Sequence, residues 1–149
     1  MLVPTRILVP TDFSEYSDRA LEQALDIAKQ YHAKVFLLHV IHDEMHHSVA
    51  FDFGLSEEVW RQINDRHLAE TKEKLRKQLD KFPQAKEVEV VANVRQGVSY
   101  DEILKEGKEK EIDLIVIASL GRTGIAKYLI GGVARNVLRG SKCPVLLTK

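Results

Sequence analysis

The chain has 149 residues, 44% of them hydrophobic and 30% charged, which is the composition of an ordinary globular protein. Its 22 basic and 22 acidic residues cancel, which argues against general binding to nucleic acids or anionic membranes, because such binding depends on excess positive charge. The single cysteine, Cys143, excludes an intrachain disulfide framework. No apolar run reaches the ~18 residues that would span a bilayer, and the first residues lack a signal-peptide pattern. We therefore expect one domain over residues 1–149, located in the cytoplasm.

The first half of the chain predicts two strands, each followed by a helix. Residues 6–9 are a short apolar strand candidate, and Ser14 is placed to cap the helix that follows it. Residues 34–40 are almost continuously apolar, as expected for a strand that helices cover on both faces. A polar segment over residues 41–55 is long for a loop, and a charged helix is then predicted from Ser56 to about residue 82, where Pro83 ends it.

The second half predicts three further strands and two helices. Residues 88–95 alternate between inward and outward positions, which indicates a strand near a sheet edge. Ser99 is expected to cap a short helix, and residues 114–118 and 144–148 are strand candidates. Strict β-α alternation predicts a doubly wound, five-stranded parallel α/β sheet with helices on both faces. In such sheets ligands bind at the carboxyl ends of the strands.

The strongest candidate site lies between Leu114 and Leu138, where a strand, a turn of small residues and a glycine pair precede a helix. The N–H groups at a helix start attract anions, so those of Gly131, Gly132 and Val133 are expected to bind phosphate. Two alternatives remain open. The glycine pair can instead serve only to let the helix pack closely on the sheet, and Asp12 can serve only to cap the helix after the first strand.

Three segments carry a family resemblance: ILVPTDFSEYSDRAL at residues 7–21, LLHVI at residues 37–41 and GRTGIAKYLIGGVARNVLRGSKCPVLL at residues 121–147. Together they resemble the universal stress protein family over essentially the whole chain. The resemblance implies an adenine-nucleotide alpha-hydrolase-like fold, with a five-stranded parallel sheet in the order 3-2-1-4-5. It also implies a regulatory protein of the stress response.

The ATP-binding members of that family carry the motif Gly, two residues, Gly, nine residues, Gly, then Ser or Thr. Gly121 and Gly131 match its second and third glycines. Ala118 replaces the first glycine, Gly132 replaces the final hydroxyl residue, and Leu120 replaces a common histidine. The motif is therefore degenerate, and the missing hydroxyl is worth roughly 0.5–1.5 kcal/mol for an uncharged hydrogen bond.

The resemblance implies a site for ATP with Mg²⁺ or Mn²⁺. It places Asp12 near the ribose and the backbone of Val40 at the adenine edge, with Pro10 and Thr11 beside them. The expected phosphate site comprises Ala118, Gly121, Arg122, Gly131, Gly132 and Val133. Arg122 or Lys127 is placed to compensate for the altered positions by pairing with phosphate oxygens. No residue pair that would activate a water stands out, so hydrolysis is expected to be slow or absent and no catalytic residue is assigned.

Other functions remain open. In the main alternative, the protein is a dimeric stress-response interaction protein that has lost nucleotide binding. Under either function we expect a homodimer through the C-terminal strand, because residues 145–147 would otherwise form an exposed apolar edge. A weaker hypothesis is metal binding by His42, His46 and His47, which is set against an ordinary solvated polar loop.

Overall fold

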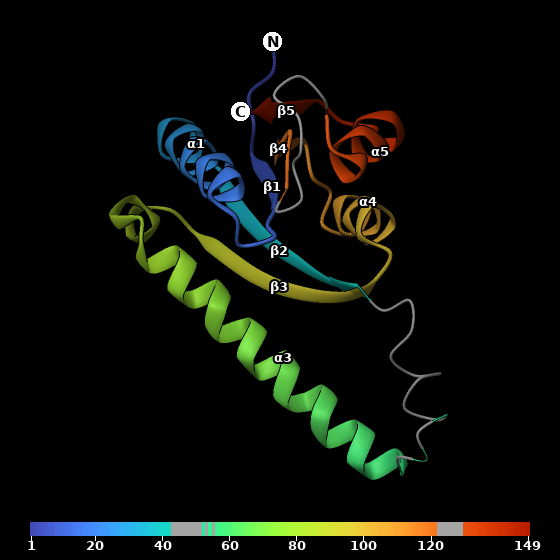
Figure 1. The fold of residues 1–149 in the computed structure, drawn as a ribbon. Helices are drawn as coiled ribbons and strands as arrows, with labels where there is room; N and C mark the ends of the chain where they lie inside the picture. Colours follow the sequence, from blue (N-terminus) through green and yellow to red (C-terminus); the bar gives the residue numbers. More distant parts are fainter. Residues whose placement is uncertain (43–51, 53, 55, 122–129) are drawn as a thin grey trace.

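A computed structural model describes residues 1–42, 52, 54, 56–121 and 130–149. Its strands form one five-stranded sheet in the order β3-β2-β1-β4-β5, and all registered neighbours run parallel (Figure 1). The predicted fold class and strand order are therefore confirmed. The elements are β1 (Arg6–Pro10), α1 (Glu15–Tyr31), β2 (Lys34–His42), α3 (Glu57–Asp80), the short 3-10 helix η1 (Pro83–Glu87), β3 (Val90–Gly97), α4 (Ser99–Glu109), β4 (Leu114–Ala118), α5 (Gly132–Gly140) and β5 (Val145–Thr148).

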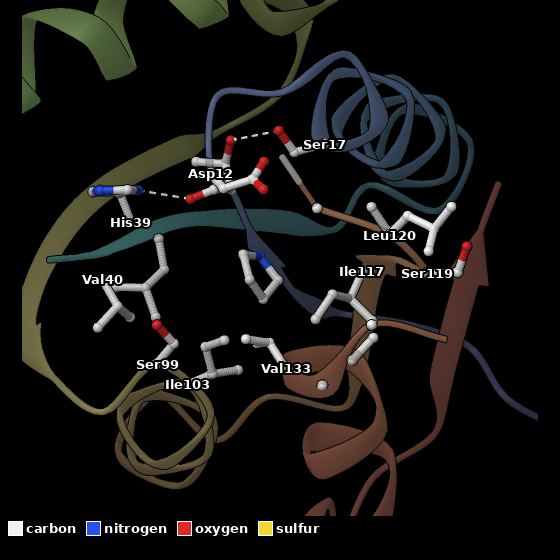
Figure 2. Close-up of a pocket in the computed structure, with 18 residues that line it drawn as sticks. Asp12, Ser17, His39, Val40, Ser99, Ile103, Ile117, Ser119, Leu120 and Val133 are labelled. Atoms are coloured by element: carbon white, nitrogen blue, oxygen red, sulfur yellow. Dashed lines mark hydrogen bonds between the residues drawn. The ribbon is translucent and has the colours of Figure 1, made fainter. Parts of the chain in front are cut away.

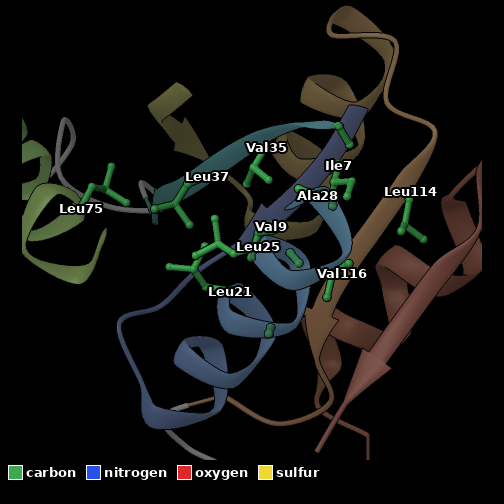
Figure 3. Packing of buried hydrophobic residues seen from close by; sticks show 13 residues of the cluster. Ile7, Val9, Leu21, Leu25, Ala28, Val35, Leu37, Leu75, Leu114 and Val116 are labelled. Carbon is green, nitrogen blue, oxygen red and sulfur yellow. The ribbon is translucent and has the colours of Figure 1, made fainter. Parts of the chain in front are cut away.

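Two apolar layers cover the sheet, one on each face. On one face α1 and α3 pack against the sheet, with Leu21, Leu25 and Leu75 buried among the strand residues (Figure 3). On the other face α4 and α5 bury Ile103 and Val137. Successive strand residues point to opposite faces, so β1 supplies side chains to both layers. Each fully buried Leu or Ile stabilises the fold by about 1.5–3 kcal/mol.

The predicted starts of two helices are confirmed by their caps. Ser14 accepts a hydrogen bond from the Ser17 N–H at the start of α1, over 3.2 Å. Ser56 does the same for α3 by accepting from the Val59 N–H over 3.3 Å. Such a cap satisfies one of the N–H groups that the first helical turn leaves without a partner.

Several boundaries differ from the predicted ones; for example, β2 continues to His42 instead of ending at residue 40. Val98, not Ser99, is the N-cap residue of α4, so Ser99 is already helical. Helix α3 ends at Asp80 instead of Phe82, because Pro83 disfavours a helical conformation in the residue before it and Phe82 is extended. Strand β3 begins at Val90 instead of residue 88, because the chain after Pro83 first forms η1.

The sheet has a switch point between β1 and β4. Registered pairing between these strands covers only Ile7 with Leu114 and Leu8 with Ile115. Strand β1 pairs with β2 along its whole length, up to Pro10 with Leu38. The chain leaves β1 toward one face and β4 toward the other, and this arrangement creates a ligand crevice at the carboxyl ends.

Helix α3 buries side chains in its second half, where Thr71, Leu75 and Gln78 are buried. In its first half Asn64 accepts a hydrogen bond from Gln96 of β3 over 2.8 Å, and the start of the helix extends beyond the sheet (Figure 1). No helix in the described part of the chain combines the length and the apolar character that crossing a bilayer requires.

Candidate functional site

A pocket with a volume of about 280 Å³ lies at the switch point, where β1, β2 and β4 end and α4 and α5 begin. In Figure 2 the Asp12 side chain lies across this pocket from Ile103 and Val133. All the predicted nucleotide-site residues that the structure describes line it: Pro10, Thr11, Asp12, Val40, Ala118, Gly121, Gly131, Gly132 and Val133. Arg122 and Lys127 lie outside the described residues.

Asp12 is the one carboxylate among the described lining residues, and the β1–α1 loop holds it in place. Its Oδ1 accepts the backbone N–H of Ser14 over 3.0 Å and also the Ser14 hydroxyl. Ser14 in turn caps α1. Asp12 is therefore not the cap of α1, as one alternative expected; it holds the capping residue Ser14, and its side chain lines the pocket.

Gly121 provides room for Asp12. A Cβ at this glycine would lie 2.7 Å from Asp12 Oδ2, which is closer than real Cβ atoms approach oxygen. The presence of glycine at the second motif position therefore has a steric explanation, since its lack of a side chain lets Gly121 lie against the carboxylate. A carboxylate beside an open turn can accept hydrogen bonds from sugar hydroxyls or help to hold a divalent cation.

The Thr11 side chain lies at the pocket and is hydrogen-bonded within the protein. This residue is 6% exposed, and its hydroxyl lies 3.0 Å from both Ser17 Oγ and Gln78 Oε1. The backbone N–H of Phe13 also donates to the Thr11 hydroxyl, over 3.1 Å. These partners belong to the protein and give the Thr11 side chain a structural role, while its place beside a nucleoside stays a prediction.

Phe13, next to Asp12, has a backbone φ of 65° in the left-handed region. A non-glycine residue there is strained by roughly 1–2 kcal/mol. The Phe13 ring packs against the His39 ring, with centroids 4.6 Å apart, and His39 Nδ1 lies 2.7 Å from the Thr11 carbonyl oxygen (Figure 2). These contacts on either side of Asp12 fix the loop in a conformation that the isolated chain would avoid.

The start of α5 supplies backbone N–H groups to the other side of the pocket. Within the described residues no side chain caps this helix, and Gly131, Gly132 and Val133 all line the pocket. However, the Gly131 N–H donates to the Ser119 carbonyl over 2.6 Å. The predicted set of three phosphate donors is therefore reduced to Gly132 and Val133.

The two altered motif positions are sterically mild. Ala118 is the last residue of β4, where extended backbone suits any side chain, and it packs beside the α1 face of the core. A Cβ at Gly132 would meet no heavy atom within 4 Å among the described residues. Position 132 therefore has space for a serine, and its glycine removes a possible hydroxyl donor without closing the pocket.

Several lining residues escaped the sequence prediction. They form much of the apolar wall and the rim: Ser17, Leu38, His39, Ser99, Ile103, Ile117, Ser119, Leu120 and Ala134. Ser99 and Ile103 follow the carboxyl end of the predicted third strand, so the rule for parallel sheets could have indicated them. Ser17 belongs to α1, and its position could not be inferred without the fold.

An ionic cluster fastens α4 to β3 beside the pocket. Arg95 contacts Glu102 and Glu109 over 2.7 and 2.8 Å, and its Nη1 lies 3.7 Å from the buried Glu106. Hydrogen bonds to Glu109 and Glu102 raise the pKa of Arg95, and the bond from Arg95 lowers the pKa of Glu102. The cluster therefore holds in place the helix that carries Ser99 and Ile103.

The described residues give the metal hypothesis little support. His42 is an exposed residue at the end of β2, while His46 and His47 lie outside the described part of the chain. Over residues 1–42, 52, 54, 56–121 and 130–149, no three His, Cys, Asp or Glu side chains are grouped so that they could hold a metal ion.

The family profile described as the universal stress protein family matches residues 4–149. The chain belongs to this family. A curated relative, universal stress protein MJ0531 of Methanocaldococcus jannaschii, is 33% identical over 145 residues, which are 97% of this chain and 81% of that protein.

Solved structures of universal stress proteins have the same fold. Protein MJ0577 of M. jannaschii superposes with a TM-score of 0.83 at 29% identity, over 99% of this chain and 97% of that chain. A universal stress protein in complex with cAMP superposes with a TM-score of 0.70 at 25% identity, over 99% of this chain and 98% of that chain.

Proposed function

We propose that this universal stress protein is a regulatory module of the stress response that binds an adenine nucleotide in the pocket at the β1–β4 switch point. The ligand we propose is ATP with Mg²⁺ or Mn²⁺. The observation that carries the proposal is the combination in one pocket of an apolar wall, the Asp12 carboxylate and the start of α5, which no described side chain caps.

Each part of the pocket suits one part of a nucleotide. Val40, Ile103 and Leu38 offer an apolar surface to a flat base. The Asp12 carboxylate accepts hydrogen bonds and so matches ribose hydroxyls. The N–H groups of Gly132 and Val133, at the positive end of the α5 dipole, match a phosphate. The related structure with cAMP supports an adenine nucleotide as the class of ligand.

We propose binding with little or no hydrolysis. Asp12 is the single acid among the described lining residues, and His39 Nδ1 is engaged with the Thr11 carbonyl. A general base must reach the attacking water and be oriented by a further group. The described lining residues supply no such pair, because the carboxylate that would hold a cation would also have to act as the base.

Isothermal titration calorimetry with ATP and magnesium tests whether the protein binds nucleotide. We expect a saturable heat signal for the wild-type protein and a smaller affinity for Asp12→Ala. An absence of heat at millimolar nucleotide would contradict the proposal.

A second candidate function, a stress-response interaction protein without nucleotide, is favoured by two observations. The motif lacks its first glycine and its hydroxyl residue, and the Gly131 N–H is already engaged with Ser119. The double variant Ala118→Gly with Gly132→Ser separates the two functions. If ATP binding appears only in the double variant, the second function is correct. If both proteins bind within about tenfold of each other, as expected when each change removes at most one uncharged hydrogen bond, the wild-type site is functional.

A further inference from the structure

A stripe of α3 contacts the loop that carries Asp12. Lys74, Gln78 and Lys81 are spaced by four and three residues, so they lie on one face of this helix. The Lys74 ammonium lies 5.9 Å from the centre of the Phe13 ring. Gln78 bonds to Thr11, and Lys81 pairs with Asp18 over 2.9 Å. The second half of α3 is therefore tied to the segment between β1 and α1 through Lys74 and Gln78, and its C-cap residue Lys81 is tied to the first turn of α1.

The orientation of the Gln78 amide is fixed by Asp18. Gln78 is 3% exposed, and its Nε2 donates to Asp18 Oδ1 over 2.8 Å. An ionised carboxylate only accepts hydrogen bonds. The nitrogen of the amide must therefore face Asp18, and the oxygen must face the Thr11 hydroxyl.

This orientation also sets the direction of the Thr11 hydroxyl. An amide oxygen cannot donate, so in the bond to Gln78 Oε1 the Thr11 hydroxyl is the donor, over 3.0 Å. Its lone pairs then remain to accept the Phe13 N–H. The neighbouring Ser17 hydroxyl donates to the Ser14 carbonyl over 2.8 Å, so Ser17 Oγ is a second acceptor, 3.0 Å from the Thr11 hydroxyl.

The result is a directed chain of hydrogen bonds from Asp18 through Gln78 and Thr11 to the backbone of Phe13. Phe13 is the residue with the left-handed backbone, and it directly follows Asp12. A residue in that region keeps its conformation only where the surrounding structure holds it. Part of the support here comes from His39, and part comes from α3, a helix that contributes none of the pocket residues.

We propose that Gln78 is a positioning residue for the nucleotide pocket. It holds the Thr11 hydroxyl, and through it the strained loop of residues 11–14, so that Asp12 is presented to the ligand. The effect on affinity rests on the proposed function. The effect on the loop does not, because it concerns the protein without ligand.

The first test measures amide hydrogen exchange of the ligand-free protein in Gln78→Met, which keeps the length of the side chain and removes both polar groups. We expect the Phe13 amide to exchange about three- to tenfold faster than in the wild type, because this is the change that corresponds to the loss of one hydrogen bond. The matched control is Thr71→Val on the same helix. Thr71 is also 3% exposed, but its hydroxyl bonds to the His67 carbonyl of its own helix.

Two further variants keep the test decisive if Gln78→Met folds poorly. Asp18→Asn removes the charged group that orients the amide, and we expect faster Phe13 exchange than in Lys81→Met, which breaks only the ion pair.

A double-mutant comparison tests whether Gln78 acts through the Thr11 hydroxyl. Adding Gln78→Met to Thr11→Val should change Phe13 exchange little beyond Thr11→Val alone, since the hydroxyl is then already absent.

The second test measures ATP affinity by titration. We expect Gln78→Met to weaken binding by about three- to tenfold relative to Thr71→Val, even where the two variants have equal melting temperatures. Equal Phe13 exchange and equal affinity in these two variants would overturn the proposal. If the wild type binds no nucleotide, the proposed function fails and the exchange data alone decide the role of Gln78.

Discussion

At the scale of single residues, the candidate site depends on how closely Gly121 approaches Asp12. The carboxylate is held from one side by Ser14 and faces the turn after β4 on the other. A methyl group at position 121 would occupy space that Asp12 Oδ2 now fills. The carboxylate would have to turn away or the turn would have to shift, and either change would alter the pocket.

We therefore predict that Gly121→Ala weakens ATP binding by about ten- to a hundredfold, the range for losing a hydrogen bond to a charged group. Titration calorimetry measures this change. Gly107→Ala is the matched control, because a Cβ at that helical position would meet only Leu8 Cδ2, at 4.0 Å. Similar losses in the two variants would contradict the steric role of Gly121.

Some residues of the candidate site could be predicted from the sequence and others could not, and the difference has physical reasons. Asp12 and Gly121 come shortly after β1 and β4, and that position in a parallel sheet indicates a ligand site. Gly131 and Gly132 were indicated by their place before a helix, and Val40 by the family resemblance. The role of Gln78 could not be predicted, because a polar residue between Lys77 and Leu79 of a charged helix looks solvated. The bond from Gly131 to Ser119 depends on how the chain returns to the sheet, which spacing does not define.

At the scale of elements, α4 is attached to the edge strand β3 partly by ionic contacts around Arg95. Glu102, with 13% of its side chain exposed, has a pKa lowered from the reference value of 4.5, mainly by its hydrogen bond to Arg95. A carboxyl group whose pKa is lower in the folded state stabilises the fold above its unfolded pKa. That contribution disappears as pH falls through the folded-state pKa.

Glu102→Gln should therefore lower the free energy of unfolding at neutral pH. The difference from the wild type should shrink once the pH falls below 4.5. Urea unfolding at both pH values measures it. Glu109→Gln is the control, since that carboxyl is 59% exposed and solvent screens its contact with Arg95. A difference that stays constant with pH would show that the charge of Glu102 is not responsible.

The order and type of the elements were predictable because apolar periodicity is strong in the buried strands. The first and last residues of the elements were less predictable. Strand β3 begins at Val90 and not at residue 88, because η1 is formed by the residues that start at Pro83. A short 3-10 helix has no apolar pattern by which the sequence could have indicated it. Ser99 suggested a cap from its residue type, but the preceding Val98 has the extended backbone of that position.

At the scale of the whole molecule, the sheet has two edge strands, β3 and β5. We propose that β5 forms a homodimer by edge pairing, since an unpaired apolar edge favours association. In this strand Val145 and Leu147 pack partly against the core, whereas Leu146 is 37% exposed. Leu146 is therefore the residue through which to test the interface without damaging the fold.

We predict that Leu146→Lys yields a monomer by light scattering, because each subunit would bring a charge to the pairing strand. Val91→Lys on β3 is the matched control, since Val91 is also 37% exposed and lies on the other edge strand. It should leave the dimer intact. A wild-type monomer, or a dimer that persists in Leu146→Lys, would contradict this interface.

The most direct test of the central claim is an NMR titration of the whole protein with ATP and magnesium, because it reports both whether nucleotide binds and where. We predict saturable shifts of the backbone amides of Asp12, Gly132 and Val133 on opposite sides of the pocket, with the core amides of β1 little changed. Unchanged spectra at millimolar nucleotide, or shifts confined to another part of the surface, would contradict the account.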